Sequence, residues 1–488
     1  MSLIVIQNLS FGYGANTIFE NLNWSFDSRF KIGLIGRNGR GKTTLLKLLQ
    51  GELSYSGKIV SSLQFSSFPI LVKNTHILAF DLIISLLPNV SDWQIYRECN
   101  LIGLDLDCLY RKYSTLSGGE TTKLGLVVLF LQENKFLLID EPTDSLDFES
   151  RQLVAEYLNS KLGFILVSHD RDFLDNCVDH ILSINKMDID FQSGNFSSWQ
   201  YNRQLLDNHM LSQNQKLEKD IDRLQDASKQ KSDWSLKAEK AKKGAADRGF
   251  MGAKAARQMK TAKIIEKRMQ SAIAKKQSLL NNIERFDDIN IECLVSYSPI
   301  LLQLKNIAIK YQSREILSNF NIEINQGERI CIVGKNGVGK SSLLKVIAND
   351  IENIQFEIVG QINRANQLKV SYLSQNMHML KGSIAQLIQH YNLDLTIFFT
   401  ILAKFGINKS HFDANIQDMS LGQKKKIGLA KSLCTPANLY IWDEPLNYLD
   451  IISRMQIEQF IVNCSPTIVF VEHDKAFCDL VSTKTIQL

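Results

Sequence analysis

Two glycine-rich segments with the same pattern lie far apart in this chain. GRNGRGKT occupies residues 36–43 and GKNGVGKS occupies residues 334–341, and both fit G-x-x-x-x-G-K-[S/T]. Each is followed by LSGGE or MSLGQ, then by an apolar run ending in Asp-Glu-Pro, then by Val-Ser-His-Asp or Val-Glu-His-Asp. Because these segments recur in nearly the same register, the sequence predicts two copies of one module.

Each glycine-rich segment follows a run typical of a buried strand and precedes a run typical of a helix. The runs before it are 30–35 and 329–333, and those after it are 43–49 and 341–347. This order of strand, loop and helix is typical of an α/β domain with a largely parallel sheet. We therefore expect an α/β fold with a first module at 1–196 and a second at 299–488.

The glycine-rich loops have the composition of phosphate-binding sites. Glycines let backbone N–H groups approach phosphate oxygens, and the following helix N-terminus favours an anion. Lys42 and Lys340 then hold the β- and γ-phosphates of ATP, while Thr43, Ser341, Asp140 and Asp443 are expected Mg²⁺ ligands. The remaining residues expected to bind the nucleotide in these loops are Gly36, Asn38, Gly39, Gly41 and Thr44, with Gly334, Asn336, Gly337, Gly339 and Ser342.

The other shared segments supply candidate catalytic groups. Glu141 and Glu444 directly follow the metal-binding Asp, where a carboxylate can orient or deprotonate an attacking water. His169 and His473 end further apolar runs and are expected near the γ-phosphate. A second anion-binding face is expected from LSGGE and MSLGQ, through Ser117, Gly118, Gly119, Ser420, Gly422 and Gln423.

The segment between the modules, 197–298, has a different pattern. Gly and Pro nearly vanish outside 243–252, and apolar residues take helical spacing at Met210, Leu217, Ile221 and Leu224 and again from Ile265 to Ile283. We expect two long antiparallel helices with a tip near 242–260. An arm of some 35 residues would reach roughly 50 Å.

Basic charge is concentrated in the distal half of this linker. Residues 231–280 carry fourteen Lys and Arg against four Asp and Glu, although the whole chain has a formal charge of only +5. Such clustering favours contact with nucleic-acid phosphates over a merely solvated helix face. The tip residues expected near RNA are Lys242, Lys243, Arg248, Phe250, Met251, Lys254, Arg257 and Lys260, of which Phe250 and Met251 either insert among bases or pack back on the hairpin.

Composition narrows the class of protein further. The sequence lacks a run of about 18 apolar residues, which a membrane helix needs, and its N-terminus does not resemble a secretion signal, so we expect a soluble cytoplasmic protein. The eight cysteines form no C-x-x-C pair, which disfavours zinc sites and a disulfide framework and predicts reduced, buried thiols.

Together these motifs resemble the ABC ATPase superfamily. Two such modules joined by a long helical linker, without membrane segments, look like its ABC-F branch. The resemblance implies a monomer in which the facing modules sandwich two ATP molecules, the glycine-rich loop of one opposite Ser and Gly of the other: Lys42 with Ser420 and Gly422, and Lys340 with Ser117 and Gly119. It also implies that Tyr13 and Tyr311 stack on adenine and that Gln375 contacts Mg²⁺ and water.

The sequence departs from the family pattern mainly in the first module. Ile70 stands where the glutamine matching Gln375 is expected, and the segment after the first Asp-Glu-Pro reads TDSLD, whereas the second reads LNYLD. We call LSGGE and MSLGQ the signature segments of the two modules; in the second, Leu421 replaces a glycine. We therefore expect two unequal ATP sites, with the slower one on the first module's loop.

The resemblance also implies a target. ABC-F proteins act on the ribosome, and GLIGRNGRGKTTLL, GFILVSHDR and YIWDEPLNYLD look like the Lsa-type antibiotic-resistance group. The expected function is ATP hydrolysis coupled to binding at the tRNA exit site (50S subunit, 23S rRNA and P-site tRNA). There the linker displaces lincosamides, streptogramin A compounds and pleuromutilins. A housekeeping translation factor, the energy subunit of a drug exporter and a DNA-repair ATPase are the alternatives.

Overall fold

The computed structural model of the chain describes residues 2–488 except 15, 144, 186–188, 242–293, 312–313, 336, 351–355, 378–379, 408–411 and 413. By internal packing it divides into two units, one formed by 1–197 with 286–488 and the other by 198–285. The first unit holds both modules. The structure confirms the expected α/β class, because each module pairs a mainly parallel sheet with helices.

The first module is built on a six-stranded sheet in the order β5-β6-β7-β3-β8-β9. All neighbours are parallel except β8 and β9, which are antiparallel. Because β3 and β6 have fully apolar interiors, both are buried centrally, and their carboxyl ends place the glycine-rich loop and Asp140 at one edge. The strands are β3 (Lys31–Gly36), β5 (Gln64–Phe68), β6 (Lys135–Asp140), β7 (Phe164–Val167), β8 (His180–Ile184) and β9 (Ile189–Ser193).

A smaller antiparallel sheet of order β2-β1-β4 covers α1 of this module, with Ile4, Ile6 and Leu9 packing into the same apolar cluster as Leu45 and Leu48. Its strands are β1 (Leu3–Tyr13), β2 (Asn16–Asp27) and β4 (Ser56–Val60). The helices of the module are α1 (Lys42–Gln50), α2 (Ala79–Leu86), α3 (Asp92–Leu101), α4 (Gly118–Phe130), α5 (Phe148–Asn159) and α6 (Arg171–Cys177), with 3₁₀ turns at Leu106–Tyr110 and Tyr113–Thr115.

The second module repeats this plan. Its parallel sheet has the order β14-β15-β16-β12-β17, and its antiparallel sheet has the order β11-β10-β13. The strands are β10 (Ile300–Tyr311), β11 (Arg314–Asn325), β12 (Arg329–Val333), β13 (Glu357–Arg364), β14 (Val370–Leu373), β15 (Leu439–Asp443), β16 (Ile468–Val471) and β17 (Lys484–Gln487). The helices are α9 (Lys340–Ala348), α10 (Ile384–His390), α11 (Leu395–Lys404), α12 (Leu421–Cys434), α13 (Ile451–Cys464) and α14 (Lys475–Val481), with a 3₁₀ turn at Ile416–Asp418.

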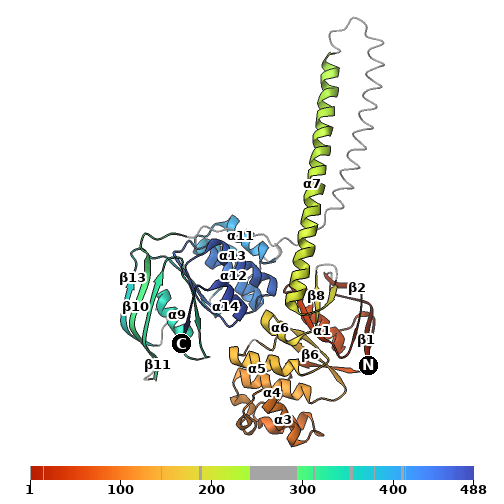
Figure 1. Ribbon diagram of the computed structural model, residues 1–488, viewed down its shortest axis with the longest axis vertical. Coiled ribbons are helices and arrows are strands. Elements are labelled where there is room, and N and C mark those ends of the chain that lie inside the picture. Colours follow the sequence, from red (N-terminus) through yellow and green to blue (C-terminus); the bar gives the residue numbers. More distant parts are fainter. Residues whose placement is uncertain are drawn as a thin grey trace. The chain divides into compact units, whose positions relative to one another are not determined.

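The expected helical linker is described over its first arm, as the long single helix α7 (Phe196–Ala241) drawn in yellow-green in Figure 1. At 46 residues it is longer than the 35 expected, and at 1.5 Å per residue it measures roughly 70 Å. The second arm, from Ile265 to Ile283, and all eight tip residues, Lys242 to Lys260, lie outside the described residues.

Seven of the eight cysteines fall in the described part, and these seven form no disulfide with one another, in line with the sequence prediction. Five are buried, whereas Cys434 and Cys464 are only partly so, and Cys293 lies outside the described residues. Within the part of the chain that the structure covers, none of the helices is long and apolar enough to cross a membrane.

Candidate functional site

The glycine-rich loops turn directly into helices through a glycine that no other residue can replace without strain. Gly41 and Gly339 are the N-caps of α1 and α9, with φ of 95° and 102°. A Cβ on Gly41 would lie 2.6 Å from Ile18 Cγ2, and one on Gly339 would lie 2.6 Å from Ile316 Cγ2. The backbone therefore curls tightly over the first turn of each helix and presents N–H groups at its positive end.

The loop lysines are buried within these loops. Lys42 Nζ donates to Gly36 O at 2.8 Å, and Lys340 Nζ donates to Gly334 O at 2.7 Å. Burial lowers the pKa of both ammonium groups. Because these acceptors are neutral carbonyls, each loop concentrates positive charge at the position where phosphate oxygens are expected. Thr44 and Ser342 are half-buried in the first helical turn, and Asn336 lies outside the described residues.

The expected metal ligands meet at the strand ends. Thr43 Oγ1 donates to Asp140 Oδ2 at 3.0 Å, and Ser341 likewise hydrogen-bonds Asp443. Burial raises the pKa of Asp140, and it raises that of Asp443 to about 6. Among the described residues Asp443 Oδ1 is buried and accepts no hydrogen bond. A buried carboxylate oxygen with free lone pairs beside a hydroxyl fits Mg²⁺, which prefers hard oxygen ligands.

The two glutamates after these strands share an unusual backbone. Glu141 and Glu444 have φ of 47° and 48°, in the left-handed region that non-glycine residues seldom occupy. In each, the backbone N–H donates to the end of the neighbouring strand, Glu141 N to Val167 O and Glu444 N to Val471 O, both at 3.0 Å. The sheet edge therefore holds the strained turn and aims both side chains alike.

The surroundings of the two carboxylates differ. Glu444 Oε2 accepts hydrogen bonds from Gln375 Nε2 at 2.6 Å and Asn447 Nδ2 at 2.5 Å. Glu141 Oε1 lies 3.1 Å from His169 Nε2, and the corresponding separation between Glu444 Oε1 and His473 Nε2 is 3.8 Å. Two amides thus orient the second carboxylate, and Asn447 is a positioning residue that the sequence reasoning missed. The difference between LNYLD and TDSLD was the available signal.

Burial keeps both histidines neutral. It lowers the pKa of His169 far below its ordinary range and that of His473 to about 4. A neutral imidazole at this position can accept or donate a hydrogen bond without repelling Lys42 or Lys340.

This burial predicts a pH dependence. Between pH 6.5 and about 4 the folded protein binds fewer protons at His473 than the unfolded chain does, so stability is complete above pH 6.5 and is lost as pH falls. We expect His473→Gln to lose about 2 kcal/mol less unfolding free energy than the wild type between pH 6.5 and 4.5. Urea titrations at both pH values check this. Parallel losses in the two proteins would contradict it.

One cavity brings loop residues of the first module to the signature of the second. It has a volume of about 500 Å³, and its lining includes Tyr13, Lys42, Glu141 and His169 from one side and Ser420, Gly422 and Tyr448 from the other. Asn38 bridges the modules, because its Nδ2 donates to Tyr448 O at 2.9 Å and its backbone N to Asp450 Oδ2 at 3.3 Å. We call this cavity, with the residues around it, the first site. Its size and chemistry suit a nucleoside triphosphate.

The other pairing of loop and signature, the second site, also has contacts from both modules. Lys335 Nζ lies 4.0 Å from Glu149 Oε2, Arg151 Nη1 donates to His473 O at 3.4 Å, and Asp147 acts electrostatically on Lys340. Ser117 caps α4 through a mutual hydrogen-bonding arrangement with Glu120. Gln423 does the same for Ser420 at α12, so its side chain serves the helix cap. Gly119, in the first turn of α4, lies beside the backbone of Ser145. Tyr311 is half-exposed at the end of β10.

The two segments that follow β5 and β14 differ in polarity. Ile70 lines a largely apolar cavity of about 590 Å³ that reaches Gly118 and Glu141. In the second module Gln375 bonds Glu444, and Met377, two residues on, is buried against Gly428. The first module therefore has an apolar wall where the second has an amide donor.

This difference predicts that substitutions at the two positions have unequal effects on ATP turnover. Gln375→Ile removes one hydrogen bond to a charged group, and we expect it to lower ATP turnover roughly tenfold or more. The matched variant Ile70→Ala deletes an apolar side chain and is expected to change turnover less than about threefold. Phosphate release at saturating ATP and Mg²⁺ measures both. Equal losses would show that the two segments contribute alike.

Comparison with known proteins agrees with this geometry. The family model for the ABC transporter matches residues 19–144 and 317–447, one stretch in each module. The chain belongs to this family. Each of its two ABC domains therefore carries the family's ATP-binding segment. The parallel and antiparallel sheets of one domain also match those of the other in strand order, apart from the added strand β9 in the first.

Several relatives align with almost the whole chain. They include the putative ATP-binding protein YdiF of Bacillus subtilis (25% identical, covering 100% of this chain and 80% of YdiF), ribosome protection protein VmlR of the same organism (26%, 98% and 85%) and the probable ATP-binding protein YheS of Escherichia coli K12 (26%, 97% and 76%). The chain is thus homologous to ABC-F proteins, as the sequence predicts.

Solved structures confirm the fold. Archaeal aABCE1, crystallised in the complex of archaeal ribosomal stalk protein aP1 and archaeal ribosome recycling factor aABCE1, superposes with a TM-score of 0.65 at 19% identity, covering 98% of this chain and 87% of that one. A structure described as RNase-L Inhibitor gives a TM-score of 0.62 at 20% identity, with 99% and 76% coverage.

Proposed function

We propose that this protein is an ATPase whose two ABC domains close on two ATP molecules. The observation that carries the proposal is the first site, where Lys42 and Thr43 face Ser420 and Gly422 across one cavity. The loop amides and Lys42 or Lys340 bind the phosphates, and the signature serine binds from the opposite module. Mg²⁺, held by Thr43 with Asp140 or by Ser341 with Asp443, supplies charge stabilisation.

The glutamates are the proposed general bases for the attacking water. Glu444, oriented by Gln375 and Asn447, is set up to accept a proton from water, and neutral His473 can hydrogen-bond the γ-phosphate. The water oxygen bonds to the γ-phosphorus as the bond to the bridging oxygen breaks, which yields ADP and phosphate. Glu141 and His169 occupy the same places in the first site, where Ile70 contributes no polar group.

The proposed target is the ribosome. Support comes from homology to ABC-F proteins, from the name of the relative VmlR and from the +10 net charge of residues 231–280. We take the chain as ABC domains at 1–196 and 299–488 and a hairpin linker at 197–298 that acts on 23S rRNA near P-site tRNA in the cytoplasm. Displacement of lincosamides, streptogramin A compounds and pleuromutilins, as in the Lsa-type group, is the specific role proposed.

Two experiments test this function. Glu141→Gln with Glu444→Gln should trap the closed form and increase co-sedimentation with ribosomes in ATP, whereas Lys42→Ala with Lys340→Ala should abolish ATP-dependent sedimentation. Translation in vitro with a lincosamide should be rescued by the wild type. Absence of ribosome binding by the trapped variant would end the ribosomal proposal.

The second experiment also separates the rival roles. A housekeeping factor would bind ribosomes and leave drug-inhibited translation unrescued. An exporter subunit would lower drug accumulation in cells without affecting purified translation.

A further inference from the structure

The contacts between the ABC domains on the two flanks of the paired sites are unequal. The two domains carry matching intradomain ion pairs, Arg151 Nη1 to Asp170 Oδ2 at 3.0 Å and Arg454 Nη1 to Asp474 Oδ2 at 3.3 Å. The arginines lie on the corresponding helices α5 and α13, and the aspartates are the N-caps of the corresponding helices α6 and α14. The two flanks therefore share the same ion pair within each domain.

A buried ion pair between the domains is found on one flank. Arg171, the first residue of α6, pairs with Glu458 on α13, and the two side chains are only 11% and 6% exposed. Arg171 follows His169 by two residues, and Glu458 lies one turn beyond Arg454; His169 and Arg454 both line the first site. We call the Arg171–Glu458 contact the flank pair. It joins the domains directly beside the first site.

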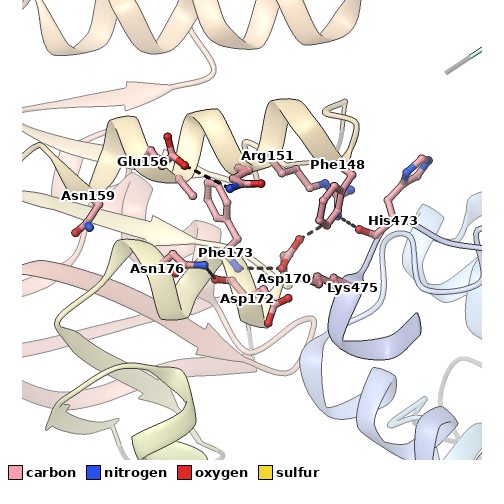
Figure 2. A pocket seen from close by; sticks show the side chains of 12 residues that line it. Phe148, Arg151, Glu156, Asn159, Asp170, Asp172, Phe173, Asn176, His473 and Lys475 are labelled. Carbon is pink, nitrogen blue, oxygen red and sulfur yellow. Dashed lines mark hydrogen bonds and ion pairs between the residues drawn. The ribbon is translucent and has the colours of Figure 1, made fainter. Parts of the chain in front are cut away.

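The opposite flank has a lysine and no matching carboxylate on the helix. Lys475 takes the place of Arg171, and Ala155 takes that of Glu458, one turn beyond Arg151. Among the described residues Lys475 makes no close ion pair across this flank, although it acts electrostatically on Asp172 of the other domain. It borders a cavity of about 280 Å³, lined by Phe148, Arg151, Ala155 and His473 among others. Figure 2 shows Arg151 directed at Asp170 and at His473 O, with Lys475 at the edge of the hollow.

Burial decides how much the flank pair matters. An exposed ion pair contributes little, whereas removing one partner of a buried pair leaves an uncompensated charge at the interface. Loss of Arg171 would leave Glu458 and Asp474 to share Arg454, because all three act electrostatically on one another. The first flank is thus costly to separate, whereas the ion pair that crosses the second, Lys335–Glu149, is exposed and contributes little.

We propose that the flank pair Arg171–Glu458 is a one-sided latch that keeps the ABC domains together beside the first site, so that they part by opening beside the second. The inference rests on the proposed ATP-driven closure. It assigns long nucleotide residence to the first site, which also lacks the glutamine, and rapid exchange to the second, where Gln375 and Asn447 orient Glu444.

Hydrogen–deuterium exchange of backbone amides in the full-length protein tests the latch without any attached probe. In the nucleotide-free protein, Glu458→Ala and Glu458→Gln should raise exchange in α6 of the other domain roughly tenfold, and Arg171→Ala should do the same in α13. Reading each substitution in the opposite domain separates loss of the latch from local unfolding. The second flank, α5 and α14, should stay unchanged, and the double variant should not exceed the larger single effect.

The matched gain-of-contact variant is Ala155→Glu, which offers Lys475 the missing carboxylate and should slow exchange in α14. Unchanged exchange in α6 for both Glu458 variants would overturn the latch. If ATP with Mg²⁺ changes exchange at neither flank in the wild type, the proposed ATP-driven closure fails, while the nucleotide-free comparison still decides the latch.

Discussion

Glu444→Gln should reduce ATP turnover at least roughly 100-fold, whereas Glu141→Gln should reduce it less than about tenfold. Loss of a positioned general base usually costs a factor of 100 to 10,000, roughly. Glu444 is held by Gln375 and Asn447, while the first site has Ile70 at the equivalent place. The base at the second site is therefore expected to carry most of the turnover, measured as phosphate release at saturating ATP.

Surface substitutions of the same kind provide the control. Glu133→Gln and Glu357→Gln remove exposed carboxylates that line neither the first-site cavity nor the cavity beside Ile70, and they should leave turnover unchanged. Fluorescent ATP analogues should still bind Glu444→Gln, since Lys340 and the loop are untouched. Equal losses for Glu141→Gln and Glu444→Gln would show that the two sites hydrolyse ATP alike.

The second large effect concerns stability. Asp450 is fully buried, and its Oδ2 lies 2.7 Å from Lys426 Nζ while its Oδ1 accepts from Ser453 N at 2.9 Å. Asp450→Ala leaves the Lys426 ammonium buried without its counter-charge, so we expect a loss of about 3–5 kcal/mol in unfolding free energy. The midpoint of thermal unfolding should fall by roughly 10 °C.

Asp147→Ala is the matched control, because Asp147 caps α5 through Ser150 N at 3.0 Å as Asp450 caps α13. Asp147 is less buried, and Lys123 Nζ in its domain donates to Gly103 O, so Asp147→Ala loses the cap and only longer-range attractions to Lys123 and Lys340, at about 1 kcal/mol. Equal losses for the two variants would show that the Lys426 contact contributes nothing.

At acid pH the difference in stability between Asp450→Ala and the wild type should become smaller. Burial raises the pKa of Asp450, but the Lys426 ammonium outweighs it and holds the pKa well below the ordinary aspartate value. The stability from a depressed carboxyl pKa is present above the unfolded value, near 3.8, and is lost as pH falls below it. Thermal midpoints of both proteins at pH 7 and pH 3.5 measure the change.

The sequence predicts the modules and loops well because their signals are local. Strand, glycine loop and helix follow one another within some 20 residues, and the observed bounds of β3 and α1 lie within one residue of those expected. Likewise, Ser117 and Ser420 begin helices because their side chains cap the next turn. Such features depend on neighbours in the chain, which a single sequence contains.

Contacts between distant segments could not be predicted in the same way. Nothing local in Asn447 indicates that its amide reaches Glu444, or in Lys426 that it pairs with Asp450 across a turn of the fold. Asn38 was expected only to bind nucleotide, yet it also bonds Tyr448 O in the other domain. Aligning the two modules shows that Ala155 in the first takes the place of Glu458 in the second. The alignment does not show that the partner of Glu458 is Arg171, which belongs to the first module.

The left-handed backbone at Glu141 and Glu444 has a consequence for how these positions can change. A non-glycine residue there costs about 1–3 kcal/mol, which the surrounding sheet edge must offset. Glycine or asparagine adopts this conformation more readily, so selection for abundance alone favours them over glutamate. In a deep mutational scan scored by protein level, Gly and Asn should outrank Glu at both positions, whereas a scan scored by activity should reverse that order at Glu444.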